Sequence, residues 1–150
     1  MKKIIYNKIG NPAKVLCIKE VKTRHLASGE ARVAVLATPI HPSNLLKISG
    51  QYGVEAKLPE TPGTEGVGRV MEVASDVKNV QVGQTVMLAG YSTWQQELIG
   101  PARSFTPLPE GADIQQLSML TINPITALLL LETFAELKEG DWIVQSAANS

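Results

Sequence analysis

The sequence predicts a mainly β body followed by two helices and one isolated hydrophobic strand. Residues 1–100 consist of short apolar segments separated by Gly, Pro, Asn and Asp, which is typical of all-β units. After Pro109 the apolar residues recur at helical spacing, and Trp142-Ile143-Val144 has the pattern of a deeply buried strand. A chain of 150 residues that is 44% hydrophobic can bury one core of this kind.

Three strands stand out in the β body. Residues 32–37 alternate, with Val33, Val35 and Ala37 on one face. Residues 67–73 and 85–89 are rich in strand-forming residues and apolar on both faces. Strands of that kind suit a barrel or sandwich whose outer surface is partly covered.

Two helices are expected after the β body. Asp113 begins a capping-box pattern for a short first helix. Asn123 is expected as the N-cap of the second helix, with Pro124 at its first position and an end near Gly140. The leucine run 128–131 is apolar all round, which implies that it is buried between two bodies.

The strand around Trp142 needs neighbours that the sequence does not supply. A β body, a connecting helix and one hydrophobic strand resemble the junction between a β domain and a doubly wound nucleotide-binding domain. We therefore expect a first domain at 1–122 and, at 123–150, the start of a dinucleotide-binding domain that is cut short. The unpaired strand and the exposed leucines predict that this segment associates with a second copy or is poorly ordered.

Composition and charge exclude several function classes. Fourteen basic residues balance fourteen acidic ones without a Lys/Arg block, which argues against nucleic acid and membranes as partners. The single cysteine, Cys17, excludes an internal disulfide, and we expect it to be buried. Polar residues interrupt the apolar start of the chain after Tyr6, so we expect no export signal and a cytoplasmic protein.

Five short motifs follow one another along the chain: Ile40-His41-Pro42-Ser43-Asn44, Ser49-Gly50-Gln51-Tyr52-Gly53, Pro62-Gly63-Thr64-Glu65-Gly66-Val67-Gly68, Thr93-Trp94, and Asn123-Pro124-Ile125-Thr126-Ala127. In order and spacing they resemble the medium-chain dehydrogenase/reductase superfamily. Within its zinc-independent branch, the likeness is to trans-2-enoyl thioester reductases and quinone oxidoreductases. The resemblance implies a GroES-like, partly open β-barrel, C-terminal linker helices and the first strand of a truncated Rossmann domain.

The resemblance also implies a reaction, the NADPH-dependent reduction of the C=C bond of an α,β-unsaturated carbonyl such as a 2-enoyl thioester. The enolate must be hydrogen-bonded at oxygen and protonated at Cα. A tyrosine phenol keeps its proton at neutral pH, and Tyr52 stands where enoyl reductases carry their catalytic tyrosine. The alternative is that Tyr52 is a loop aromatic that packs beside Gly50 and Gly53.

Four further residues are candidates for the substrate cleft that the resemblance implies between the two domains. His41 is either a substrate or proton-relay group or a hydrogen-bonded wall residue. Ser43 and Asn44 either line the cleft or make local turn hydrogen bonds after a proline, and Asn44 departs from the Asp of close relatives. Trp94 either covers the cleft or belongs to the core.

The cofactor candidates lie near the end of the chain. The resemblance places Asn123 and Thr126 beside the nicotinamide, although capping alone also explains Asn123. Asn149 belongs to the leading edge of a phosphate-binding loop whose glycines are absent. We therefore expect NADPH to bind the full-length enzyme and not this piece, which should be inactive alone.

A metal site is not expected. The zinc branch of the superfamily places its ligands where this chain has His41, Thr64 and Ile122. His41 and Glu65 together fall short of the three protein ligands of a catalytic zinc. The neighbouring glycines of Pro62-Gly63-Thr64-Glu65-Gly66-Val67-Gly68 lead into a strand without a following helix, so they predict a tight backbone path around a buried structural acid, Glu65, and no phosphate loop.

Three other functions stay open at this point. A quinone oxidoreductase of the same superfamily shares most of the motifs, whereas a zinc alcohol dehydrogenase is opposed by Thr64. A stand-alone chaperonin-10-like binding module is opposed by the linker helix and the last strand. The expected partners are a small-molecule substrate, an enoyl thioester or a quinone, and a second copy of the chain in a homodimer.

Overall fold

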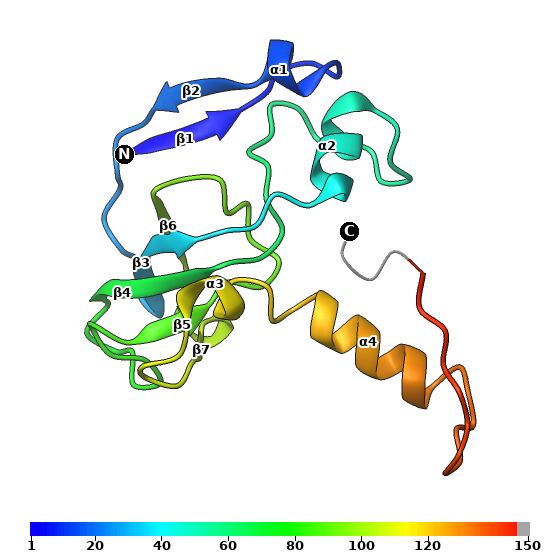
Figure 1. Ribbon diagram of the computed structural model, residues 1–150. Helices are drawn as coiled ribbons and strands as arrows, with labels where there is room; N and C mark the ends of the chain where they lie inside the picture. Colours follow the sequence, from blue (N-terminus) through cyan, green and yellow to red (C-terminus); the bar gives the residue numbers. More distant parts are fainter. Residues whose placement is uncertain (147–150) are drawn as a thin grey trace.

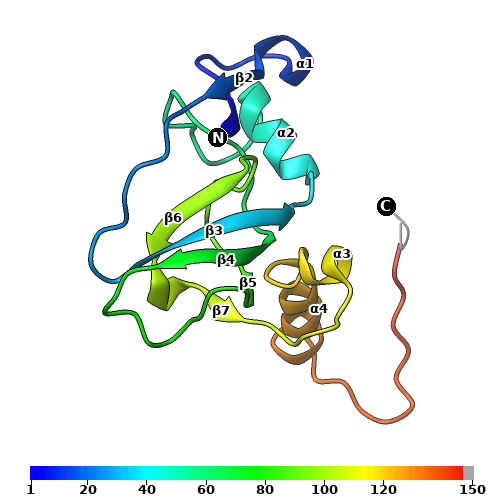
Figure 2. The ribbon, with the colours of Figure 1, turned by 90° about the vertical axis from the view of Figure 1, so that its left-hand side faces the viewer.

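The computed structural model describes residues 1–146, and its centre is a five-stranded antiparallel sheet (Figures 1 and 2). In the order of the sheet, the strands are β6 (Glu97–Pro101), β3 (Glu30–Ala37), β4 (Val67–Val73), β5 (Thr85–Met87) and β7 (Thr106–Pro107). All four neighbouring pairs are antiparallel, and β3 is the long strand that joins β6 to β4. The three predicted strands are therefore confirmed.

A second sheet is the pair β1 (Lys2–Ile5) and β2 (Cys17–Glu20), with the short helix α1 (Pro12–Val15) between the two strands. This hairpin lies above the larger sheet in Figure 1. One backbone hydrogen bond to the rest of the fold is donated by the Ile4 amide to the Trp94 carbonyl. The two sheets do not close into a barrel, which agrees with the predicted partly open, mainly β fold.

The main core lies on the inner face of the five-stranded sheet. Ala31 and Val33 alternate with partly exposed residues along β3, because successive side chains of a strand point to opposite faces. They pack with buried residues of the neighbouring strands and loops, namely Val70, Val80, Val86, Leu88, Leu98, Ala102 and Phe105. A smaller cluster of Tyr6, Ile48 and Trp94 joins the hairpin to the helix α2 (Pro42–Ser49).

Short helices surround the sheet. Helix α2 ends at its C-cap residue, Gly50. The φ of Gly50 is 77°, which is the left-handed conformation that favours glycine at a helix C-terminus. The 3-10 turn η1 (Ala102–Ser104) follows β6. In α3 (Ile114–Leu117), the Gln116 amide donates to Asp113 Oδ1 at 2.9 Å, which confirms the predicted cap.

The last helix, α4 (Asn123–Glu132), differs from expectation at both ends. Ile122 is its N-cap, so Asn123 is the first helical residue and not the cap. The helix ends at Glu132, well before Gly140. No residue of α4 is buried, and the leucines at 128–131 are exposed, so the burial inferred from their apolar pattern is not found within residues 1–146. Without a packed face, nothing but backbone hydrogen bonds extends the helix.

The expected strand at Trp142-Ile143-Val144 is not formed. Trp142 and Val144 are each 95% exposed, and the segment has no strand partner among residues 1–146. An isolated strand leaves its backbone groups unpaired, so the pattern alone does not produce the structure. Figure 1 shows this segment beyond the end of α4, away from both sheets.

The expected burial of Cys17 is also wrong, because the residue is exposed. It belongs to β2, every residue of which is exposed at the edge of a two-stranded sheet. Within the described residues, no helix combines the length and apolarity that a membrane span requires.

Candidate active site

Tyr52 lies two residues beyond Gly50, on an exposed loop between α2 and β4. Its side chain is 47% exposed, and it is not part of either core cluster. The phenol is therefore accessible from solvent, as a group that acts on a ligand must be.

Glu60 fixes the far end of the Tyr52 loop. Its backbone pairs with Tyr6 through reciprocal hydrogen bonds of 3.0 and 3.1 Å. Its carboxylate accepts from the Tyr6 hydroxyl at 2.9 Å and from Lys47 Nζ at 2.5 Å. Because Lys47 belongs to α2, the loop is held to the same helix from which it departs. Burial, together with the hydrogen bond and the charge of Glu60, raises the pKa of Tyr6 far above its usual value.

His41 and Glu65 form the most buried polar pair of the site. His41 is the N-cap residue of α2, and its Nε2 lies 2.7 Å from Glu65 Oε1. The Glu65 side chain is fully buried, whereas His41 is 15% exposed. The tautomer of the imidazole decides which of the two groups donates the hydrogen of this contact. The expected buried acid is confirmed, and His41 is hydrogen-bonded as a wall residue.

The second oxygen of Glu65 holds the segment that leads into α4. Glu65 Oε2 accepts from the Thr121 amide at 2.9 Å, from the Thr121 hydroxyl at 2.5 Å and from the Ile122 amide at 3.1 Å. These are the amides immediately before the first helical residue. One buried carboxylate thus connects the start of α2 to the start of α4.

Ser43 and Asn44 lie in the first turn of α2. Asn44 is buried, and its Oδ1 accepts from the His41 amide at 3.1 Å, which is the local hydrogen bond expected of a turn after Pro42. Ser43 is half-buried. Asn44 Oδ1 is therefore occupied in starting the helix, and the cleft role of Ser43 and Asn44 stays a prediction.

Trp94 belongs to the smaller core cluster and is 7% exposed. Its Nε1 donates to the Pro39 carbonyl at 3.3 Å. One edge of the side chain also borders a cavity of about 660 Å³ between the hairpin and β3. Trp94 thus packs in the core, whereas its expected role in covering a cleft between two domains stays a prediction.

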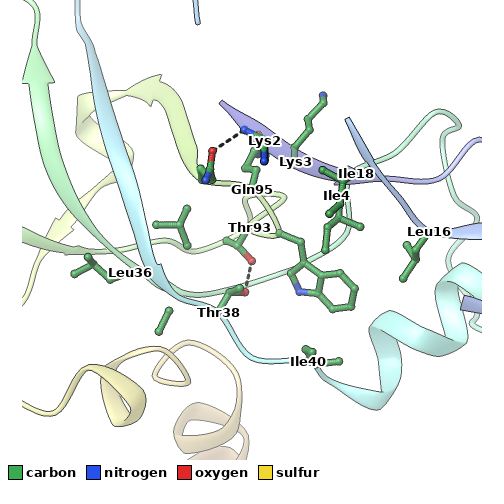
Figure 3. A pocket seen from close by; sticks show the side chains of 14 residues that line it. Lys2, Lys3, Ile4, Leu16, Ile18, Leu36, Thr38, Ile40, Thr93 and Gln95 are labelled. Atoms are coloured by element: carbon green, nitrogen blue, oxygen red, sulfur yellow. Dashed lines mark hydrogen bonds between the residues drawn. The ribbon is translucent and has the colours of Figure 1, made fainter. Parts of the chain in front are cut away.

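The cavity beside Trp94 is apolar. Figure 3 shows Ile4, Ile18, Leu36 and Ile40 around it, with the Thr38 and Thr93 hydroxyls hydrogen-bonded at 2.6 Å. Tyr52 is not among its lining residues. The cavity and the predicted catalytic tyrosine are therefore separate features of the molecule.

The glycine-rich turn before β4 is closely packed. A Cβ on Gly63 would lie 2.7 Å from the Thr93 amide, and one on Gly66 or Gly68 would lie 2.7 Å from the carbonyl oxygen of Ala37 or Ala34. The backbone fills this space, so the turn offers no room for a phosphate. The predicted tight backbone path is confirmed.

The cofactor candidates lie at the start of α4 or outside the described residues. Asn123 and Thr126 are exposed, and the Thr126 amide is engaged with the Ile122 carbonyl. Asn149 lies outside the described residues. Within residues 1–146, no group of three or more His, Cys, Asp or Glu side chains is arranged to hold a metal.

Sequence reasoning identified Glu65 as a buried acid but missed what it holds. Its partners are 24 residues before it and 56 to 57 residues after it. No local pattern joins such distant positions. The motif Pro62-Gly63-Thr64-Glu65-Gly66 supplied a signal, since an acid within an apolar turn needs donors when it is buried.

Comparison with known proteins matches residues 27–110 to the alcohol dehydrogenase GroES-like domain. The mitochondrial enoyl-[acyl-carrier-protein] reductase of Rattus norvegicus is 36% identical over 149 residues, which are 98% of this chain and 40% of that protein. The chain thus spans about two fifths of the length of the curated relatives that it matches.

The chain is also similar to solved structures of reductases. The complex of Etr1p with NADP and crotonyl-CoA is 27% identical, with a TM-score of 0.81 over 91% of this chain and 44% of that chain. Etr1p of Candida tropicalis is also solved as a heterodimer with Etr2p. The Escherichia coli quinone oxidoreductase complexed with NADPH is 27% identical, with a TM-score of 0.76 over 92% of this chain and 42% of that chain.

Proposed function

Because the chain belongs to the alcohol dehydrogenase GroES-like domain family, we propose that it is the substrate-side part of an NADPH-dependent enoyl thioester reductase. The observation that carries the proposal is the 36% identity with an enoyl-[acyl-carrier-protein] reductase over 98% of this chain. The likeness runs through α4 and so includes both Tyr52 and the linker. It supports an enzyme of which this chain is one part.

Tyr52 is the proposed proton donor. Its phenol is exposed on a loop that is fixed at one end by the Gly50 cap and at the other by Glu60. A loop held at both ends can orient a donor with little loss of freedom on binding. The hydroxyl would hold the enolate oxygen or deliver the proton to Cα, while Cβ receives the hydride.

The described residues of this chain offer candidate contacts for the nicotinamide end of the cofactor but not for its pyrophosphate. Reduced NADPH, when bound, would supply the hydride. The side chains of Asn123 and Thr126, which are exposed at the start of α4, would contact the nicotinamide end in this proposal. The glycine-rich turn before β4 offers the pyrophosphate no cradle, because Thr93 and Trp94 fill the space at Gly63. We therefore place the phosphate contacts in the part of the relatives that this chain does not cover.

The test is a turnover assay on a protein that carries these residues together with a dinucleotide-binding domain. With crotonyl-CoA and NADPH, we expect butyryl-CoA to form as NADPH is consumed, one for one. Absence of butyryl-CoA in a folded preparation that binds NADPH would exclude thioester reduction.

A quinone reductase is the second candidate. The likeness to the NADPH complex of the Escherichia coli quinone oxidoreductase, at 27% identity, equals that to the Etr1p complex. The two functions differ in the need for a proton donor at Cα, and Tyr52 favours the thioester. The same assay with a benzoquinone in place of crotonyl-CoA separates them.

We also propose that the full-length enzyme is a homodimer and that it is cytoplasmic. The Etr1p/Etr2p heterodimer is a precedent for pairing among similar proteins. In the full-length enzyme, we propose that the exposed leucines of α4 pack against the dinucleotide-binding domain, which would remove the largest apolar run of this chain from water.

A further inference from the structure

We propose that Glu65 is a positioning residue that fixes the direction of α4 relative to α2. The inference rests on the proposed function, in which α2 leads to the proton donor Tyr52 and α4 begins with cofactor-side groups. Glu65 touches neither reactant in this proposal. It acts through the two helices whose starts it holds.

The geometry of the carboxylate carries the inference. Glu65 is 0% exposed, and both of its oxygens are used. Oε1 contacts His41 Nε2, and Oε2 accepts three hydrogen bonds from Thr121 and Ile122. A buried carboxylate is costly unless its hydrogen bonds are complete, and here donors from two separate segments complete them.

Each partner begins a helix. His41 is the N-cap of α2, and Tyr52 follows two residues after the Gly50 cap at the other end. Ile122 is the N-cap of α4, whose first turn carries Asn123 and Thr126. The carboxylate thus holds the two residues that immediately precede the first helical residue of α4, at the end of the helix where the dipole favours a negative charge.

The attachment matters because α4 has no other firm support among its own residues. None of its ten residues is buried. In Figure 1 the helix projects to the right, away from the β body and from the short helix α3. Its direction is consequently set where it begins, at the segment that Glu65 holds.

The experiment measures the distance between α2 and α4 in this chain. In a Cys17→Ser background, Leu46→Cys on α2 and Leu130→Cys on α4 place spin labels at exposed positions. Pulsed electron resonance then gives the distribution of distances. We expect a single narrow distribution that broadens or shifts in Glu65→Ala and in Thr121→Val.

Conservative variants distinguish positioning from general stabilisation. Thr121→Ser keeps the hydroxyl and should restore the narrow distribution, and Thr133→Val at the other end of α4 should leave it unchanged. If Glu65→Ala does not fold, the comparison of Thr121→Val with Thr121→Ser decides. Melting temperatures are recorded in parallel.

An unchanged distribution in folded Thr121→Val or Glu65→Ala, whatever the loss in melting temperature, would overturn the inference. An equal broadening in Thr133→Val would do the same. The measurement needs no turnover, so its failure leaves thioester reduction open. Conversely, an inactive enzyme with the expected distances would count against the proposed function alone.

Discussion

Two tyrosines of this chain occupy opposite environments. Tyr6 is buried and donates to Glu60, whereas Tyr52 is half exposed on the loop that Glu60 anchors. The first therefore contributes to the stability of the fold, and the second is available for chemistry. Replacement of either hydroxyl should separate these roles.

Tyr52→Phe should lower kcat for crotonyl-CoA by roughly a hundredfold in a protein that includes the dinucleotide-binding domain. The loss follows from removing the group that protonates Cα or holds the enolate. The fold should be intact, because the side chain is outside both core clusters. Tyr91→Phe, which keeps the ring stacked on Phe105, is the matched control. Near parental turnover in Tyr52→Phe would remove Tyr52 from the mechanism.

Tyr6→Phe should destabilise the chain at neutral pH by about 1–3 kcal/mol, because Glu60 loses a donor. Burial first, and then Glu60, raises the pKa of Tyr6 in the folded state. The contribution is present in full below the unfolded pKa, at about pH 10, and is lost as pH rises above it. Denaturant unfolding at a series of pH values should show that the free energy of unfolding falls more steeply with rising pH in the parent than in Tyr6→Phe. Tyr52→Phe is the control and should keep the pH dependence of the parent. An equal pH dependence of the free energy of unfolding in the parent and in Tyr6→Phe would contradict this prediction.

For single residues, the sequence predicted burial and capping better than it predicted hydrogen-bond partners. The buried acid Glu65 and the cap at Asp113 follow from local patterns, and both are confirmed. The contacts of Glu65 with His41 and Thr121 were not predictable, because the fold brings these positions together. Cys17 was misjudged because composition says nothing of an edge strand.

At the scale of elements, the turn before β4 shows how closely backbone and side chains fit. Gly63 has a φ of 99°, and a Cβ there would meet Thr93 and Trp94. We expect Gly63→Ala to lower the free energy of unfolding by at least about 2 kcal/mol. Gly53→Ala, where an added methyl meets open space, should have a small effect. Equal losses in denaturant unfolding would show that the turn is not under this constraint.

The strands of the β body were predictable because their alternation and composition describe a surface that the chain itself buries. The resemblance to the medium-chain superfamily and to its GroES-like domain is likewise confirmed. The two C-terminal helices were predictable as well, whereas the strand at Trp142 and the length of α4 were not, because neither segment is packed against other described residues. A pattern for burial does not form a strand without a partner.

For the whole molecule, the exposed apolar surface of α4 predicts self-association. Leu128 to Leu131 are each more than two fifths exposed, and Trp142 is almost fully exposed. Light scattering should show dimers or larger species as concentration rises. Leu130→Glu should weaken the association, whereas Val82→Glu, at an exposed position in a distant loop, should not. A monomer at every concentration would contradict this prediction.

The central claim is that this chain supplies the substrate side of a reductase, whereas the cofactor phosphates bind to the part of the relatives that this chain does not cover. Calorimetric titration of NADPH into the chain tests it most directly. Since the glycine-rich turn at Gly63 is filled and we place the phosphate contacts outside this chain, we expect no detectable binding up to millimolar NADPH. Micromolar binding by a well-folded monomer would contradict the claim.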